Sequence, residues 1–385
     1  MTEHEKLLSS LIEIKSYSGE EKDIRGYIKK WFKERKIDSF RQDENLIVHF
    51  EGADRSKAFI FNSHMDTVNR GDAAWEYGPW KPTKVGNTLV GLGASDMKSG
   101  LTASMILAEK YSNEKPPVDL WFTYVTREEV DGSGTDSFAR WFSQNKYNIQ
   151  YKDKAGIFTE PTGLKEIEHG HRGNLFLIAQ AEGESGHSSR PGDIKGTLAV
   201  KQMFNFSQSF QEQVKLWNEK YQSKYFNPAI TLGELTSIQA GVNVVTKNGL
   251  PVIVPASPNK FPSLCVATFD LRTTPEFHAA ALKKVEDLAK KEGIKVDLLY
   301  PEAPAGFTDP QEKIIEITKS KVPDAILKVS QGSADLGFLT GLGIKAIIFG
   351  PGEKLQAHKT NEYCYPVKIP QAVDLYQAIV ESWAK

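Results

Sequence analysis

The feature that most constrains this chain is a repeated alternation of short apolar runs with helical patterns. Apolar runs that resemble buried strands lie at 46–50, 58–62, 118–125, 155–159 and 344–350. Apolar residues recur at helical spacing near the N-terminus, and the run from Met97 to Tyr111 is also typical of a helix. Strands that alternate with helices favour an α/β fold, so we expect a mostly parallel central sheet flanked by helices.

The middle of the chain has a different pattern. A strand-like run over 174–181 is followed by a long helical stretch, and residues 264–271 alternate as a half-buried strand does. A chain of 385 residues also exceeds one ordinary domain of about 100–200 residues. We therefore expect a catalytic domain formed by 1–169 and 301–385, with a smaller α+β unit inserted over 170–300.

Composition and charge argue against several classes of partner. The formal net charge is -1 and no block of Lys or Arg stands out, so we expect no nucleic-acid or membrane partner. Cys265 and Cys364 are too few for a disulfide framework. The N-terminus lacks a signal pattern, and no apolar run reaches the ~20 residues of a membrane span. We expect a cytoplasmic protein.

Histidine and carboxylate side chains gather just past the ends of the strand-like runs, or at the start of a helix between two of them. These residues are His64, Asp66, Asp96, Glu128, Glu129, Glu160 and His358. The carboxyl ends of parallel strands share one edge of a sheet, and α/β sheets place their sites there. Two histidines and several carboxylates suit a divalent ion such as zinc. The sequence therefore predicts a metal site at that edge.

Local spacing suggests individual roles. His64 and Asp66 are two residues apart, so their side chains share a side in an extended segment, and Asp66 can orient the His64 ring. Adjacent Glu128 and Glu129 point in different directions, which suits one as a ligand and the other as a base. Plainer interpretations exist, such as Asp96 as a helix N-cap. The shared sheet edge favours the metal site over them.

Five short segments carry more specific information. They are Ser63-His64-Met65-Asp66-Thr67-Val68, residues 91–100, Glu128-Glu129, Thr159-Glu160-Pro161 and residues 357–362. Together they resemble the co-catalytic zinc aminoacylase and carboxypeptidase family, which includes acetylornithine deacetylase, succinyl-diaminopimelate desuccinylase and glutamate carboxypeptidase. The motifs occur in the family's order, and the resemblance extends from about residue 7 to residue 380.

The resemblance implies a centre with two metal ions. His64, Asp96 and Glu160 would hold one ion. Asp96, Glu129 and His358 would hold the second, so that Asp96 bridges the two. Zinc is the ion that the family implies, and cobalt or manganese can occupy the same ligands.

The resemblance also implies roles for residues outside the ligand set. Glu128 resembles the general base, and Asp66 resembles the partner of the first histidine ligand. The inserted unit resembles a lid and dimerisation domain, whose His187 would steady the oxyanion in the partner subunit's site of a homodimer. Asn243 and Arg272 resemble lid residues that hold the oxygen atoms and the carboxylate of the substrate.

Two departures from the family's pattern bear on the substrate. Leu92 stands where arginine is usual, and Thr246 stands where proline is usual. Plainer interpretations also remain for the three lid residues. Arg272 can form a strand-end salt bridge with Asp270, His187 can be a loop-tip histidine, and Asn243 can be a turn former.

The resemblance implies an amide hydrolase, and we expect it to deacylate a small N-acyl amino acid through a metal-bridged water. A first alternative is a dipeptidase or carboxypeptidase of the same family that acts on short peptides. A second is a catalytically silent homologue that binds only metal or a partner, although all the ligand and base positions are filled. A serine hydrolase is disfavoured because the chain has no Gly-x-Ser-x-Gly motif.

Overall fold

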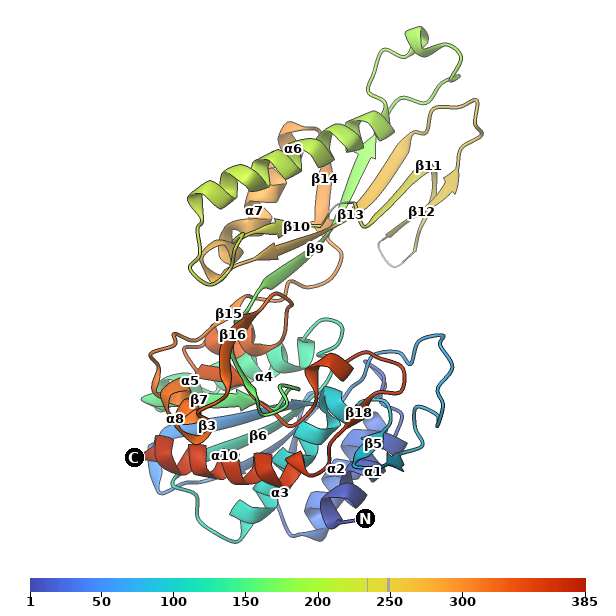
Figure 1. Cartoon of the computed structure of the whole chain (residues 1–385). Coiled ribbons are helices and arrows are strands. Elements are labelled where there is room, and N and C mark those ends of the chain that lie inside the picture. Colours follow the sequence, from blue (N-terminus) through green and yellow to red (C-terminus); the bar gives the residue numbers. More distant parts are fainter. Residues whose placement is uncertain (234, 248–249) are drawn as a thin grey trace. The chain divides into compact units, whose positions relative to one another are not determined.

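The computed structural model describes residues 1–233, 235–247 and 250–385, with the side chains of 243–252 outside that description. The chain forms two compact units, each with its own hydrophobic core (Figure 1). Unit 1 comprises Met1–His171, Gly306–Ser330 and Ala334–Lys385, and unit 2 comprises Arg172–Ala305 and Gln331–Ser333. We expected a catalytic role for the part that resembles unit 1 and a lid role for the part that resembles unit 2, and both roles remain predictions.

A mixed nine-stranded sheet forms the centre of unit 1. Its strands are β1 (Phe40–Gln42), β2 (Asn45–Phe50), β3 (Asp54–His64), β6 (Val118–Val125), β7 (Asp153–Phe158), β8 (Glu166–His171), β15 (Gly306–Phe307), β16 (Ile326–Ser330) and β17 (Lys345–Ile348). The order is β1-β2-β6-β3-β7-β17-β8-β15, and β16 pairs with β8. The four central strands, β6, β3, β7 and β17, run parallel to one another, whereas β2 and β8 pair with them antiparallel. The expected α/β fold with a mostly parallel centre is confirmed.

Helices cover both faces of this sheet, which explains why its central strands are apolar almost throughout. In β3, Phe59 and Phe61 face one core cluster, and Ala58 and Ile60 face the other. The first cluster includes side chains of α1 (Glu3–Glu13), α2 (Lys22–Glu34), α3 (Ser99–Ser112), α8 (Lys313–Lys321) and α10 (Lys368–Ala384). The second includes those of α4 (Ser133–Gln144), α5 (Tyr147–Gln150) and α9 (Leu336–Thr340).

A small antiparallel sheet completes unit 1, with two short helical segments beside it in the sequence. Its strands are β4 (Thr83–Val85), β5 (Thr88–Val90) and β18 (Tyr363–Cys364), in the order β18-β5-β4. The helical segments are η1 (Ala94–Lys98), which leads directly into α3, and η3 (Lys354–Gln356). The pairing of β18 with β5 brings a C-terminal segment beside the one that contains Asp96.

Unit 2 is an antiparallel sheet with two helices packed against it. Its elements are β9 (Gly173–Glu182), η2 (Pro191–Asp193), α6 (Ala199–Lys220), β10 (Thr231–Leu232), β11 (Ser237–Lys247), β12 (Leu250–Pro255), β13 (Leu264–Thr273), α7 (Pro275–Lys291) and β14 (Lys295–Leu298). The main order is β12-β11-β13-β9-β14, and β10 pairs with β13. Phe206 and Phe210 of α6 pack with Phe269 of β13 and Phe277 of α7 in its core. Among the described helices of the chain, none has the length and apolar character needed to cross a bilayer.

The start of α3 approaches the end of β7 very closely. A Cβ atom added to Gly100 would lie 1.8 Å from the backbone oxygen of Thr159, so only glycine fits there. This contact fixes the distance between the segment that contains Asp96 and the segment that contains Glu160. The glycine is therefore part of what positions the site.

Gly100→Ala should lower the free energy of unfolding by about 1–3 kcal/mol, because the new methyl group forces the helix away from the strand. Gly26→Ala in α2 is the matched control. An added Cβ there meets no atom within 4 Å, so it should stabilise the protein by about 0.4–1 kcal/mol. Denaturant unfolding of both variants tests this, and a Gly100→Ala variant as stable as the wild type would contradict the close approach.

Candidate active site

The parallel centre of the sheet brings distant parts of the chain to one edge. His64 is the last residue of β3, and Glu128 and Glu129 follow β6 by three and four residues. Glu160 follows β7 by two residues, and His358 lies in the segment after β17. Because β6, β3, β7 and β17 are parallel, all these residues follow the same edge.

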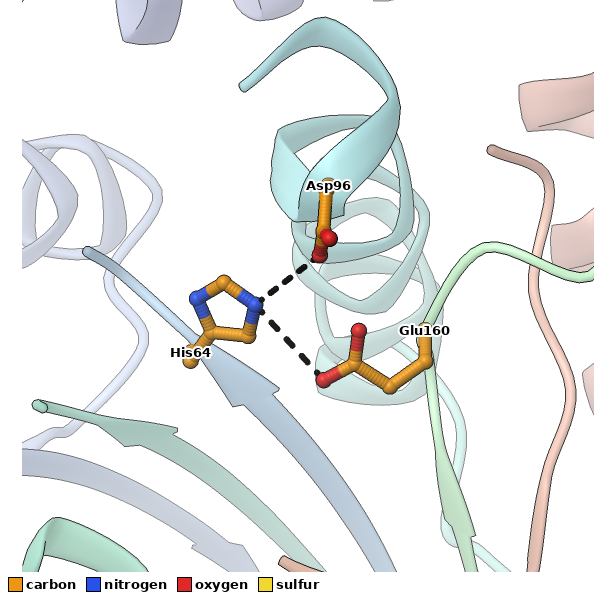
Figure 2. A group of neighbouring side chains, drawn as sticks. All are labelled: His64, Asp96 and Glu160. Atoms are coloured by element: carbon orange, nitrogen blue, oxygen red, sulfur yellow. Dashed lines mark hydrogen bonds and ion pairs between the residues drawn. The ribbon is translucent and has the colours of Figure 1, made fainter. Parts of the chain in front are cut away.

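The side chains form two groups that share Asp96. In the first group, His64 Nε2 lies 3.2 Å from Asp96 Oδ1 and 3.6 Å from Glu160 Oε1 (Figure 2). In the second, His358 Nε2 lies 2.9 Å from Glu129 Oε2 and 3.5 Å from Asp96 Oδ2. Within each group, one potential ligand atom from each residue lies within 4.8 Å of the others. The two oxygens of Asp96 thus face different groups, as a bridging carboxylate requires.

The electrostatics of both groups fit bound cations. Burial, together with the charges of Asp96 and Glu129, raises the pKa of Glu160 to about 8 even though His64 opposes the shift. Burial and the charge of Asp96 also raise the pKa of Glu129. Glu129 Oε1 is buried and has no hydrogen-bond partner among the described residues. Nitrogen and carboxylate donors of this kind suit zinc and similar divalent ions.

The histidines respond to the same crowding of negative charge. Burial opposes protonation of His64, but Glu160, Asp66 and Asp96 outweigh it and raise its pKa well above 6.5. The hydrogen bond with Glu129 raises the pKa of His358 to about 9. In the metal-free chain, protonated histidines therefore supply positive charge that a bound cation would replace.

Glu128 lies beside these groups but belongs to neither of them. Burial raises its pKa well above the ordinary value, and the charges of Glu160 and Asp335 add to the shift. A carboxyl group whose pKa is raised in this way can accept and return a proton during a reaction. Its neighbour Glu129 faces His358 instead, so the adjacent pair divides between two environments.

Asp66 is fully buried and organises both sides of the site. The Nδ1 atom of His64 lies 3.0 Å from the Asp66 carbonyl oxygen and 3.4 Å from its carboxylate. The carboxylate accepts hydrogen bonds from Ser18 Oγ at 2.6 Å and from the backbone N–H groups of Glu128 and Glu129, each at 3.2 Å. Asp66 therefore orients the His64 ring and also fixes the backbone beside the two glutamates.

Three further side chains, which the sequence patterns did not single out, hold the loops of the site. Buried Glu21 accepts hydrogen bonds from the backbone N–H groups of Gly19 and Arg127, at 2.9 and 3.1 Å. Lys98 Nζ donates to the carbonyl oxygens of Leu11 and Ile14, and burial lowers its pKa to about 7.

The third of these side chains is Glu362, which accepts hydrogen bonds from three backbone N–H groups near Asp96. Lys98 and Glu362 lie within two of the segments that carry the family resemblance, residues 91–100 and 357–362, so the sequence did contain a signal for them. Glu21 had no such signal in the sequence.

Of the three sequence-predicted residues of unit 2, the two whose side chains are described, His187 and Arg272, are not part of either side-chain group. His187 is exposed, and its Nδ1 lies 2.8 Å from Ser189 Oγ. Arg272 forms a two-point salt bridge with Asp270, from Nε at 2.7 Å and from Nη2 at 2.9 Å. The plainer interpretation of Arg272 is therefore present in the structure. Asn243 lies in β11, and its side chain is outside the described part of the chain.

Comparisons with known proteins agree with this geometry. Residues 60–382 match a family described as Peptidase family M20/M25/M40. The chain is 25% identical to an acetylornithine deacetylase of Buchnera aphidicola subsp. Acyrthosiphon pisum, over 79% of this chain and 75% of the relative. It is 25% identical to a probable succinyl-diaminopimelate desuccinylase of Staphylococcus epidermidis, over 98% and 97%. The solved structure of an M20 family metallo-carboxypeptidase from Sulfolobus solfataricus has the same fold, with a TM-score of 0.73, 16% identity and 100% coverage of both chains.

Removal of divalent ions with a chelator should lower the midpoint of thermal unfolding, because an ion that binds only the native state stabilises it. The effect is about 2.7 kcal/mol when the free ion is at 100 times its Kd. Added Zn²⁺ should restore the midpoint, and His358→Ala should show a lower metal content and a smaller shift. If elemental analysis shows that the chelator has removed the metal and the midpoint is unchanged, the two side-chain groups are not a metal site.

Proposed function

The chain belongs to the M20/M25/M40 peptidase family of amide-bond hydrolases, and we propose that it deacylates N-acyl amino acids. The observation that carries this proposal is the pair of ligand groups that share Asp96, with the proton-accepting Glu128 beside them. The relatives named as an acetylornithine deacetylase and a probable succinyl-diaminopimelate desuccinylase support the choice of substrate class.

Within this proposal, His64, Asp96 and Glu160 hold one divalent ion, and Asp96, Glu129 and His358 hold the other. Zinc is the proposed resident ion because the histidine and carboxylate donors suit it, and cobalt or manganese would accept the same ligands. When bound, such ions lower the pKa of water and polarise a carbonyl group.

Glu128 serves as the general base and acid. It takes the proton from the attacking water and returns it to the amine that leaves, which is a contribution typically worth about 100–10,000-fold. Asp66 supports this step because its carboxylate holds the backbone N–H of Glu128 and faces the His64 ring. The base therefore starts from a fixed position relative to the first ligand group.

Arg272 is the proposed group that binds the substrate carboxylate, and Asn243 is proposed to contact substrate oxygens. The salt bridge to Asp270 involves Arg272 Nε and one of the two hydrogens on Nη2. A guanidinium has five N–H donors, so Nη1 and the remaining Nη2 hydrogen can still form a two-point contact with a carboxylate. Asp270 would then hold the guanidinium in the orientation that this contact requires.

A dipeptidase or carboxypeptidase activity is the second candidate. Recognition of a free carboxylate by Arg272 would suit a peptide's C-terminus as well as an N-acyl amino acid. The two activities differ in their products. A peptidase releases two amino acids, or a shorter peptide and an amino acid, whereas a deacylase releases one carboxylic acid and one amino acid.

A panel of N-acetyl and N-succinyl amino acids and simple dipeptides separates the candidates. Metal-stripped protein should release amine from one acyl series only after Zn²⁺ is added. Glu128→Ala is the control, and it should lose at least about 100-fold in turnover while retaining its metal, because it removes the base and no ligand. Turnover of dipeptides alone would favour the peptidase. Absence of turnover on every compound by the zinc-loaded protein would contradict the proposal.

We also propose that the protein is a homodimer formed through unit 2 and that His187 acts in the partner subunit's site. The exposed position of His187 is compatible with this role. There it would donate to the oxyanion that forms on the substrate carbonyl, where loss of one donor costs about 100–1,000-fold in turnover.

Mixing two inactive variants tests the trans arrangement. Glu128→Ala and His187→Ala homodimers should each be impaired. After subunit exchange, a mixed dimer contains one site with both Glu128 and His187 intact, so the mixture should recover about a quarter of wild-type activity. No recovery, in a mixture shown by mass spectrometry to contain mixed dimers, would place His187 in its own subunit's site, and an unimpaired His187→Ala homodimer would place it outside catalysis.

A further inference from the structure

Glu362 is a buried carboxyl group whose side-chain hydrogen bonds join it to the segment that leads into Asp96. Only 1% of its surface is exposed. Its Oε2 accepts a hydrogen bond from the backbone N–H of Gly93 at 2.8 Å. Its Oε1 accepts two, from the backbone N–H groups of Ser95 at 2.7 Å and Asp96 at 2.8 Å. One side chain therefore binds three backbone donors within four residues.

Further contacts join the same two segments. The backbone N–H of Gly91 donates to the Glu362 carbonyl oxygen at 2.9 Å. Ser95 Oγ donates to the Tyr363 carbonyl oxygen and accepts from the backbone N–H of Glu353, both at 2.8 Å. The segment 91–96 is thus held along its length by residues 353–363. The Glu362 side chain is the only carboxyl group among these contacts.

The position of Asp96 must satisfy two partners at once. Its Oδ1 lies 3.2 Å from His64 Nε2, and its Oδ2 lies 3.5 Å from His358 Nε2. A small rotation of the backbone at Asp96 would lengthen one of these distances. The backbone N–H of Asp96 is one of the groups that Glu362 binds, and Glu362 follows His358 by four residues.

We propose that Glu362 is a positioning residue that fixes the backbone of Asp96 so that its two carboxylate oxygens serve both metal ions. Residues 358–362 thereby supply a ligand of the second ion and also the anchor of the shared ligand. This inference rests on the proposed function, because it takes Asp96 as the bridging ligand. The three hydrogen bonds that the Glu362 carboxylate accepts come from backbone N–H groups and from no candidate metal-binding atom.

The chemistry of the side chain explains why glutamate is needed. A glutamine has one carbonyl oxygen, and its amide nitrogen is a donor that would face the N–H of Gly93 or of Ser95 and Asp96. At least one buried backbone donor would then lose its acceptor. An aspartate keeps the charge but is one methylene shorter, so it cannot reach all three donors without a backbone shift.

Unit 1 contains a matched control for a buried carboxylate. Asp119 is 0% exposed and accepts hydrogen bonds from the backbone N–H of Gly52 at 2.8 Å and from Tyr151 Oη at 2.7 Å. It is the second residue of β6, at the opposite end of that strand from Glu128 and Glu129. Asp119→Asn should therefore weaken the fold without reaching the candidate metal centre.

The test measures zinc affinity of the full chain by competition with a chromophoric chelator, together with thermal unfolding of the metal-free protein. Glu362→Gln should weaken binding of at least one Zn²⁺ by about 10–100-fold, as loss of an outer partner of a ligand typically does. The visible spectrum of the Co²⁺-loaded variant should also change, because the ligand geometry changes. Asp119→Asn should lower the unfolding midpoint and leave zinc affinity and the Co²⁺ spectrum unchanged.

Two results would overturn the inference. One is a folded Glu362→Gln variant with wild-type zinc affinity and an unchanged Co²⁺ spectrum. The other is an equal loss of affinity in Asp119→Asn, which would indicate general destabilisation. If Glu362→Gln does not fold, Glu362→Asp replaces it, and wild-type affinity in that variant has the same meaning. Failure of the proposed function is distinguishable, because wild-type protein would then bind no zinc or Asp96→Asn would retain both ions.

Discussion

Repulsion among buried carboxylates is the interaction on which the arrangement of this site depends. Asp96, Glu129 and Glu160 are held close together beside two histidines, and burial, with the negative charge of the neighbouring carboxylates, raises the pKa values of the two glutamates. An outer pair of carboxyl groups is anchored to the backbone instead. Asp66 and Glu362 each accept hydrogen bonds from backbone N–H groups. These bonds oppose the effect of burial, which still raises the pKa of Glu362 to about 8. The inner oxygens are thereby left to be balanced by cations.

The sheet brings the residues of this arrangement together. Four parallel strands end at one edge, so residues as far apart in the sequence as His64 and His358 both lie within 3.5 Å of Asp96. Gly100 lets the start of α3 contact the end of β7, which brings Asp96 and Glu160 to the same histidine. Each ligand group therefore combines a residue at a strand end with one held by a neighbouring loop or helix start.

The sequence predicted the parts of this structure that depend on residue type and periodicity. Buried strands are apolar, and His64, Glu129 and Glu160 follow them directly, so the sheet edge could be inferred before the structure was known. The anchors could not be inferred in this way. Glu362 and Glu21 bind backbone N–H groups, which every residue except proline carries, so no pattern of side chains identifies their partners. The Asp270–Arg272 pair was foreseen because alternate residues of a strand share a face.

The position of β17 has a consequence for how the chain is made. This strand lies between β7 and β8 in the sheet, although it is synthesised roughly 190 residues after β7 ends. At about 5–20 residues per second, a ribosome needs on the order of 10–40 s to cover that interval. During this time the edges of β7 and β8 that will face β17 have no partner strand, and unpaired edges invite association with other chains. Newly made chains are therefore most exposed to misassembly, and most in need of chaperones, while unit 2 is being translated.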